Sequence, residues 1–228
     1  MIRENLRARI ASTRCVLFDF DGPVCRVFAH HAGQTPLSVA ADMRQLVRER
    51  GISLELTDPL DVLRAVGELR PGSELLADLE EWLTQQELRA APGAWPTMYA
   101  DRLIQTWRAT GCRLAVTADA SARTVAKYLA RRGLTECFGP HIYGRTADVG
   151  LLKPHPQLLL QALQDIDTDP GTALMIGDSV SDLRAAEAAG VPFLGYATHD
   201  RRVDELAAAG ADLVLNTFEP VLDVLWNR

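Results

Sequence analysis

Five short apolar runs, each ending abruptly in a polar residue or a glycine, constrain the fold of this chain more than any other feature. They occupy residues 15–22, 113–119, 172–178, 191–197 and 211–217. Near-continuous apolar runs of this length are typical of strands covered on both faces, as in a parallel sheet, whereas half-exposed antiparallel strands alternate. We therefore expect these runs to form a parallel sheet.

The segments between the runs have the signals of helices. Ser121 is a candidate N-cap for a helix that stops at Gly133, and Ser179 or Ser181 for a helix that stops at Gly190. A further helix is expected over residues 97–110. Strands and helices that alternate at this spacing indicate a doubly wound α/β fold.

The interval between the first two runs is too long for a single crossover helix. Apolar residues recur there at helical spacing in residues 36–51, 58–70 and 73–88, with proline and glycine at the breaks, and no convincing strand is present. We predict an all-helical insert over residues 25–92, between two parts of one α/β core, residues 1–24 and 93–228.

Composition excludes several classes of protein. The apolar fraction of 47% and the charged fraction of 24% are those of a globular chain. No apolar stretch approaches the roughly 18 residues of a membrane-spanning helix. The first residues lack the apolar stretch of a signal peptide, so we expect the cytoplasm and no membrane partner. A net charge of −6 argues against nucleic acid as the main partner.

Cysteines give no sign of a metal site or a disulfide framework. The four cysteines, at positions 15, 25, 112 and 137, show no CxxC pair or zinc-finger spacing. We expect reduced thiols.

Polar side chains gather where the predicted strands end. Asp19 and Asp21 end the first run, Thr117 lies at the end of the second and Asp178 ends the third. Ligands of open parallel sheets bind beyond the carboxyl ends of the strands. Three carboxylates at one edge repel one another unless a cation shares the site, and hard oxygen ligands suit Mg²⁺. Lys153, in the loop LLKPHP, is the natural countercharge.

The spacing of the first two aspartates suits phosphoryl transfer. Residues i and i+2 project to the same side of a strand, so Asp19 and Asp21 are expected to face one ligand. One carboxylate can attack while the other handles protons. Mg²⁺ and Lys153 would offset charge on the transferring group.

These motifs resemble those of the haloacid dehalogenase superfamily, in its phosphoglycolate-phosphatase-like subgroup with a helical C1 cap. DFDG at 19–22 resembles the first motif, Thr117 the second, Lys153 the third and GDSVSD at 177–182 the fourth. The helical insert has the position of the cap, so the resemblance covers nearly the whole chain. It implies a Rossmann-like core with an inserted cap.

The resemblance also implies roles for individual residues. Asp19 would be the nucleophile and Asp21 the general acid/base, with Lys153 as the third catalytic group. Thr117, Lys153 and the backbone N–H of Ala118, where many members carry asparagine, would bind the phosphate. The implied metal site consists of Asp19, Asp21 through its carbonyl, Asp178 and Asp182. Another interpretation of Asp182 is an acidic residue at a helix N-terminus.

The activity implied is Mg²⁺-dependent hydrolysis of a small phosphate monoester through an aspartyl-phosphate, with a small phosphorylated metabolite as the partner. A phosphosugar mutase that uses the same intermediate is an alternative. A non-catalytic binding protein on the same fold is another. Asp21 disfavours a dehalogenase, and the long insert disfavours a phospho-acceptor receiver domain.

The oligomeric state stays open between monomer and homodimer. Arg26 is expected at the surface, and His30 and His31 at the start of an exposed helix.

Overall fold

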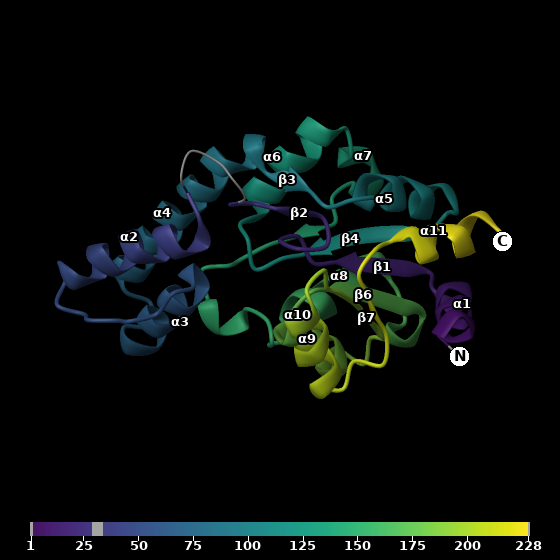
Figure 1. The fold of residues 1–228 in the computed structure, drawn as a ribbon. Helices are drawn as coiled ribbons and strands as arrows, with labels where there is room; N and C mark the ends of the chain where they lie inside the picture. The colour runs from purple at the N-terminus through teal and green to yellow at the C-terminus, as the bar shows by residue number, and fades with distance from the viewer. Residues whose placement is uncertain (1, 29–33, 228) are drawn as a thin grey trace.

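A six-stranded parallel sheet lies at the centre of the protein (Figure 1). The computed structural model describes residues 2–28 and 34–227, so His30 and His31 lie outside the described residues. The strand order is β5-β4-β1-β6-β7-β8, and every neighbouring pair is parallel. The predicted parallel sheet is therefore confirmed.

All five apolar runs contain strands. They are β1 (Cys15–Phe18), β4 (Arg113–Thr117), β6 (Ala173–Gly177), β7 (Phe193–Tyr196) and β8 (Val214–Leu215). The sixth, β5 (Ile142–Tyr143), was not predicted; it pairs two residues with β4 at the sheet edge and is too short to show a periodicity. β1 is shorter than the predicted strand, because the chain turns at Asp19 after a last hydrogen bond from its N–H to Ile176 O, 2.8 Å.

Helices cover both faces of the sheet. Val16, Phe18 and Val116 point into one layer with α1 (Ile2–Ser12), α5 (Ala100–Ala109), α6 (Ala122–Arg132), α7 (Thr135–Phe138) and α11 (Glu219–Trp226). Leu17 and Met175 point into the other, with α8 (Gln157–Ile166), α9 (Val180–Ala189) and α10 (Asp200–Ala208). Burial on both sides explains why the strands are apolar throughout.

The caps and ends predicted for two helices are confirmed, whereas α1, α7 and α11 were not predicted. Ser121 caps α6 and Ser179 caps α9, each by accepting a backbone N–H, and Gly133 and Gly190 end these helices. The helix predicted over 97–110 is α5. One of the helices not predicted is α1, whose Leu6 and Ile10 are buried although four of its 11 residues are charged.

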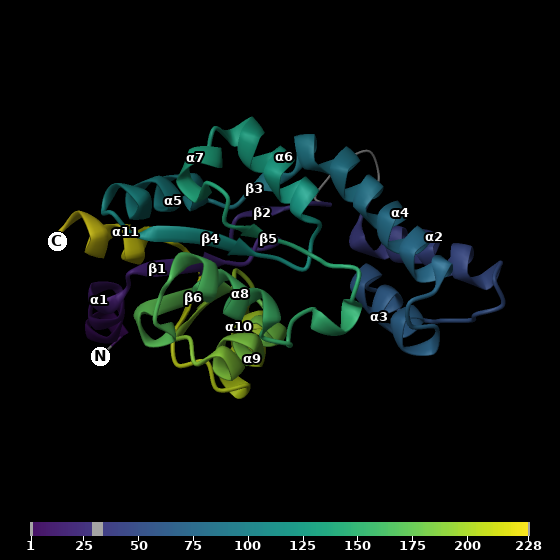
Figure 2. The ribbon, with the colours of Figure 1, turned by 180° about the vertical axis from the view of Figure 1, so that it is seen from behind.

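Three helices form the predicted insert. They are α2 (Pro36–Arg48), α3 (Pro59–Leu69) and α4 (Glu74–Ala90), capped by Thr35, Asp58 and Ser73. An antiparallel ribbon of β2 (Cys25–Arg26) and β3 (Trp95–Pro96) brings the entry and exit of this segment together. The prediction of an all-helical insert over 25–92 was therefore wrong at its first two residues, where a two-residue strand shows no periodicity. Figure 2 shows the three helices beyond the carboxyl ends of the strands, at the end of the molecule away from both termini. The limits 25–92 of a cap domain stay a prediction.

Two smaller findings complete the fold. All four cysteines are free thiols, and three of them are buried. Within residues 2–28 and 34–227, no helix has both the length and the apolar character that a bilayer-spanning helix needs.

Candidate active site

A buried lysine joins two aspartates at the carboxyl edge of the sheet. Lys153 Nζ lies 2.5 Å from Oδ1 of Asp19 and 2.5 Å from Oδ1 of Asp182. The three side chains come from the loop before α8, the turn after β1 and the first turn of α9. Burial opposes the charge of Lys153, but Asp182 and Asp19 outweigh it, so the pKa of Lys153 is raised.

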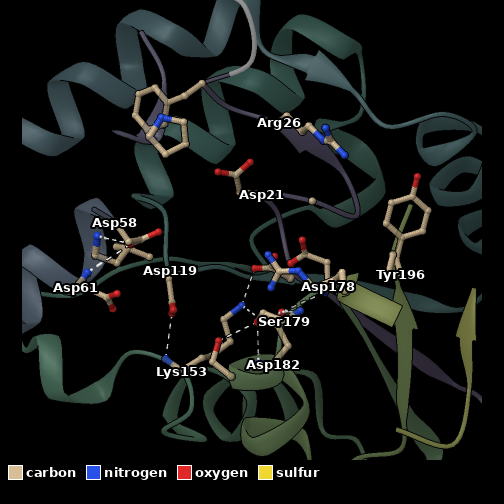
Figure 3. Close-up of a pocket in the computed structure, with 18 of the residues that line it drawn as sticks. Asp21, Arg26, Asp58, Asp61, Asp119, Lys153, Asp178, Ser179, Asp182 and Tyr196 are labelled. Carbon is tan, nitrogen blue, oxygen red and sulfur yellow. Dashed lines mark hydrogen bonds and ion pairs between the residues drawn. The ribbon is translucent and has the colours of Figure 1, made fainter. Parts of the chain in front are cut away.

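Asp178, which follows β6, completes a carboxylate group. Asp19, Asp178 and Asp182 each offer one oxygen within 4.8 Å of the others, and Figure 3 shows Asp178 and Asp182 beside Lys153. Burial and then Asp182 raise the pKa of Asp178 to about 7. The same two causes raise the pKa of Asp19 above its usual range. The group thus holds more negative charge than Lys153 neutralises, which is the environment that a hard cation stabilises.

Asp182 also has a structural role. Its Oδ2 accepts hydrogen bonds from Ser179 N (3.1 Å), Ser179 Oγ (2.6 Å) and Asp178 N (3.2 Å). It forms a capping box with Ser179, as expected for an acidic residue at a helix N-terminus. Gly177 makes this approach possible, because a Cβ there would lie 2.5 Å from Asp182 Cβ. Asp182 therefore fixes the start of α9 and orients Lys153; its role as a metal ligand stays a prediction.

Asp21 lies apart from Asp178 and Asp182, on the side of the β2 segment (Figure 3). Its Oδ1 accepts the Val27 N–H at 3.0 Å. Asp21 is exposed at the cavity, but desolvation by the surrounding protein raises its pKa to about 6, against the lowering effect of this hydrogen bond. The expectation that a strand aligns Asp19 and Asp21 was wrong, because β1 ends at Phe18. Both residues nevertheless line the same cavity.

Thr117 and Ala118, at the end of β4, were expected to bind phosphate, but in this structure their donor groups are directed at other protein atoms. The Thr117 hydroxyl is directed at Met175 Sδ, 3.6 Å away, and the side chain is fully buried. The N–H of Ala118 donates to Tyr143 O at 2.8 Å, in the hydrogen bonding that joins β4 to β5. The prediction that this N–H is available to a phosphate is therefore not met in this structure. The role of Thr117 stays a prediction.

Asp119 and Arg64 were missed by the sequence interpretation. Asp119 follows β4 and accepts the Lys153 N–H at 3.1 Å. Arg64, on α3, donates to Lys153 O at 2.8 Å. Burial raises the pKa of Asp119, while Lys153 opposes the rise. The polar end of the apolar run 113–119 was a usable signal for Asp119; a single arginine on a charged helix offered none.

These groups line one cavity of about 1020 Å³ between the sheet edge and the helical insert. Thr35, Asp58, Asp61 and Arg64 form the wall contributed by the insert. Tyr196, Thr198, His199 and Arg202 form the opposite wall. Arg26 is exposed, as predicted, and its Nη2 donates to Thr198 Oγ1 at 3.2 Å across the rim. The cavity has room for a small phosphorylated molecule.

Comparison with known proteins identifies the family. The haloacid dehalogenase-like hydrolase family matches residues 13–190, which is most of the chain. This protein belongs to that family. A haloacid dehalogenase family hydrolase of Deinococcus radiodurans, solved with bound phosphate and sodium, is 26% identical; the match covers 95% of this chain and 96% of that chain, with a TM-score of 0.63.

Two further relatives bear on the resemblance. A phosphoglycolate phosphatase of Salmonella paratyphi A is 30% identical over 117 residues, which are 51% of this chain and 46% of that protein. The matches cover between 30% and 54% of the length of the curated relatives compared. A putative beta-phosphoglucomutase structure from Thermotoga maritima is 19% identical, covers 94% of this chain and 99% of that one, and has a TM-score of 0.63. At that identity it shows the fold alone.

Proposed function

We propose that this member of the haloacid dehalogenase-like hydrolase family is a Mg²⁺-dependent phosphatase of small phosphate monoesters, with Asp19 as the nucleophile. The observation that carries the proposal is the Asp19 carboxylate, which lies just beyond β1 with one oxygen bonded to Lys153 Nζ at 2.5 Å and Asp178 beside it. A carboxylate nucleophile next to a fixed cation suits phosphoryl transfer. The Deinococcus hydrolase with bound phosphate and the Salmonella phosphoglycolate phosphatase support this class of substrate.

The donor set fits a hard divalent cation. The three carboxylates carry more charge than Lys153 balances, and all the donors are oxygens. Asp19 and Asp178 would hold the ion, with Asp21 contributing through its backbone carbonyl and Asp182 as a supporting residue. When bound, Mg²⁺ would offset negative charge on the transferring phosphoryl group.

The residues of the chain then divide the remaining work. The Asp19 carboxylate attacks phosphorus and forms an aspartyl-phosphate, while the Asp21 carboxyl protonates the leaving oxygen. Asp21 next removes a proton from water, which attacks the phosphorus and releases phosphate and free Asp19. Lys153 balances charge on the phosphoryl oxygens and holds Asp19 in place. The helices α2–α4 would close over the cavity as a cap and exclude water.

The test is steady-state hydrolysis of an aryl phosphate by wild type and Asp19→Asn, each with Mg²⁺ and with a chelator. We expect turnover only when both the metal and Asp19 are present. Asp204→Asn, at an exposed position on α10 outside the cavity, is the matched control and should keep full activity. Turnover that survives Asp19→Asn would overturn the proposal. A phosphosugar mutase would instead move the phosphoryl group within a sugar phosphate and release little free phosphate, which a phosphate assay on sugar phosphates detects.

Location is the last element of the proposal. We propose that the protein acts in the cytoplasm, a compartment that keeps thiols reduced. The four free cysteines support this.

A further inference from the structure

The backbone of Lys153 is held on both sides by side chains from distant segments. Its N–H donates to Asp119 Oδ1 at 3.1 Å, and its carbonyl accepts Arg64 Nη2 at 2.8 Å. The same Nη2 lies 3.4 Å from Asp119 Oδ2. Arg64 belongs to α3, whereas Asp119 follows β4, so the helical insert reaches the lysine of the core directly. Figure 3 shows Asp119 between the insert and Lys153.

A second contact joins the same helix to the same loop. Gly67 lies three residues after Arg64, on the same face of α3. A Cβ at position 67 would lie 2.3 Å from Val149 Cγ2, in the short helical turn Val149–Leu151 that leads to Lys153. The backbone of α3 therefore rests directly on this loop.

We propose that Arg64 and Asp119 are positioning residues that clamp Lys153, so that the placement of α3 is transmitted to the lysine beside Asp19. This inference rests on the proposed function, which gives Lys153 its role at Asp19. Lys153 Nζ bridges two buried carboxylates, so it tolerates little displacement of its own backbone. A misplacement of about 1 Å in an active site costs about 100-fold in rate.

The neighbours of Arg64 favour a clamp over a substrate receptor. Its guanidinium already meets two carboxylates, Asp61 at 3.1 Å and Asp119 at 3.4 Å, as well as the Lys153 carbonyl. Its charge is therefore largely neutralised within the protein. Loss of a residue that positions Lys153 lowers kcat, because it slows the chemical step. Loss of a residue that binds the substrate equally in the ground and transition states raises KM and leaves kcat unchanged.

The experiment compares Arg64→Ala, Arg64→Lys, Asp119→Asn and the double variant Arg64→Ala/Asp119→Asn with wild type. Arg70→Ala is the matched control, because Arg70 ends the same helix and its side chain bonds only the Arg50 carbonyl at 3.5 Å among the side-chain bonds described. With an aryl phosphate we expect Arg64→Ala to lower kcat by about 10- to 100-fold with little change in KM. Arg64→Lys should restore part of the loss, since an ammonium group still reaches the Lys153 carbonyl. The double variant should lose no more than the worse single variant.

Hydrogen exchange supplies a measurement that does not need activity. The clamp predicts faster exchange of the Lys153 amide in Arg64→Ala and Asp119→Asn, and wild-type exchange in Arg70→Ala. If wild type hydrolyses no ester, the proposed function fails while exchange still decides the clamp. A rise in KM at unchanged kcat, additive losses in the double variant, or unchanged exchange at Lys153 would each overturn it. Circular dichroism first establishes that each variant folds. If Asp119→Asn does not fold, Arg64→Ala and Arg64→Lys are enough to test the clamp.

Discussion

Gly22 lies so close to Asp178 that a side chain at position 22 would occupy the place of the carboxylate. A Cβ atom there would lie 2.5 Å from Asp178 Cγ and 2.6 Å from Oδ2. Gly22 also has a φ of +139°, a conformation that side chains rarely adopt. The glycine of the DFDG motif therefore lets the chain turn away from β1 across the face of a candidate metal ligand.

Replacing Gly22 by alanine should damage both stability and the site. We expect Gly22→Ala to lower the free energy of unfolding by about 2–4 kcal/mol, from backbone strain plus overpacking, and to weaken Mg²⁺ binding. Gly111→Ala is the control, because Gly111 has a φ of +81° but nothing within 4 Å of an added Cβ. It should cost only about 1 kcal/mol. Urea denaturation and calorimetric Mg²⁺ titration make the comparison; equal losses in the two variants would show that the Asp178 contact is unimportant.

Lys153 should be far more important to stability than the other lysine. Lys153→Met leaves Asp19 and Asp182 buried without their cation, which should cost about 3–5 kcal/mol. Lys127, the other of the two lysines in the sequence, is exposed, and its side chain bonds only the Leu88 carbonyl at 2.8 Å among the contacts described, so Lys127→Met should change stability by less than about 1 kcal/mol. Urea denaturation at neutral pH measures both. A Lys153→Met protein as stable as wild type would contradict this account of the carboxylate group.

The stability of the metal-free protein should carry a pH signature of Asp178. Its pKa is raised from the ordinary value of 3.8 to about 7, first by burial and then by Asp182. A carboxyl whose pKa is raised by folding stabilises the fold while protonated, and this contribution is lost as the pH rises to about 7. Bound Mg²⁺ removes the cost of the ionised form. We therefore expect Mg²⁺ to raise Tm at pH 8 by about 5 °C more than at pH 5.5.

Asp178→Asn is the control for this pH dependence. The amide does not titrate, so the difference between the Mg²⁺ effects at the two pH values should shrink in this variant. Thermal unfolding with Mg²⁺ and with a chelator measures both proteins. An equal effect of Mg²⁺ at both pH values in wild type would contradict the assignment of Asp178 to the metal site.

Arg145 fastens helix α4 to the core by a buried ion-pair network. Its side chain is fully buried and bonds Glu87 at 2.7 Å, Glu80 at 3.0 Å and Thr84 Oγ1 at 2.9 Å. Arg145→Met leaves two carboxylates without their partner, so we expect a loss of about 3–5 kcal/mol. Arg123→Met, which removes an exposed pair with Glu81 on the same helix, should cost no more than about 1 kcal/mol. Urea denaturation measures the free energy of unfolding of both variants. Similar losses in Arg145→Met and Arg123→Met would contradict the role of Arg145 in fastening α4 to the core.

Much of the fold could be predicted because its signals are local. Consecutive apolar residues are enough to predict β1, β4, β6, β7 and β8. The N-caps Ser121 and Ser179 bond only backbone N–H groups of the following turn, so they too can be predicted from neighbouring residues. The helix α1 escaped prediction since only Leu6 and Ile10 face the core, and their partners lie in α11 at the other end of the chain. The edge strand β5 was not predicted because two residues are too few to show a periodic pattern.

For the candidate site, local sequence patterns are enough to predict which residues stand at the ends of the strands, and so which side chains could meet. Parallel strands necessarily bring their carboxyl ends to one edge, and this brought Asp19 and Asp178 together as expected. Lys153 joins them from the loop before α8. The directions in which those side chains point depend on turns and packing that local patterns do not encode. The turn after Phe18 directs Asp21 to the Val27 N–H, and the Thr117 hydroxyl is directed at Met175. The clamp of Arg64 and Asp119 on Lys153 likewise depends on how α3 packs against the core, because contacts between residues far apart in the chain leave no periodic trace in it.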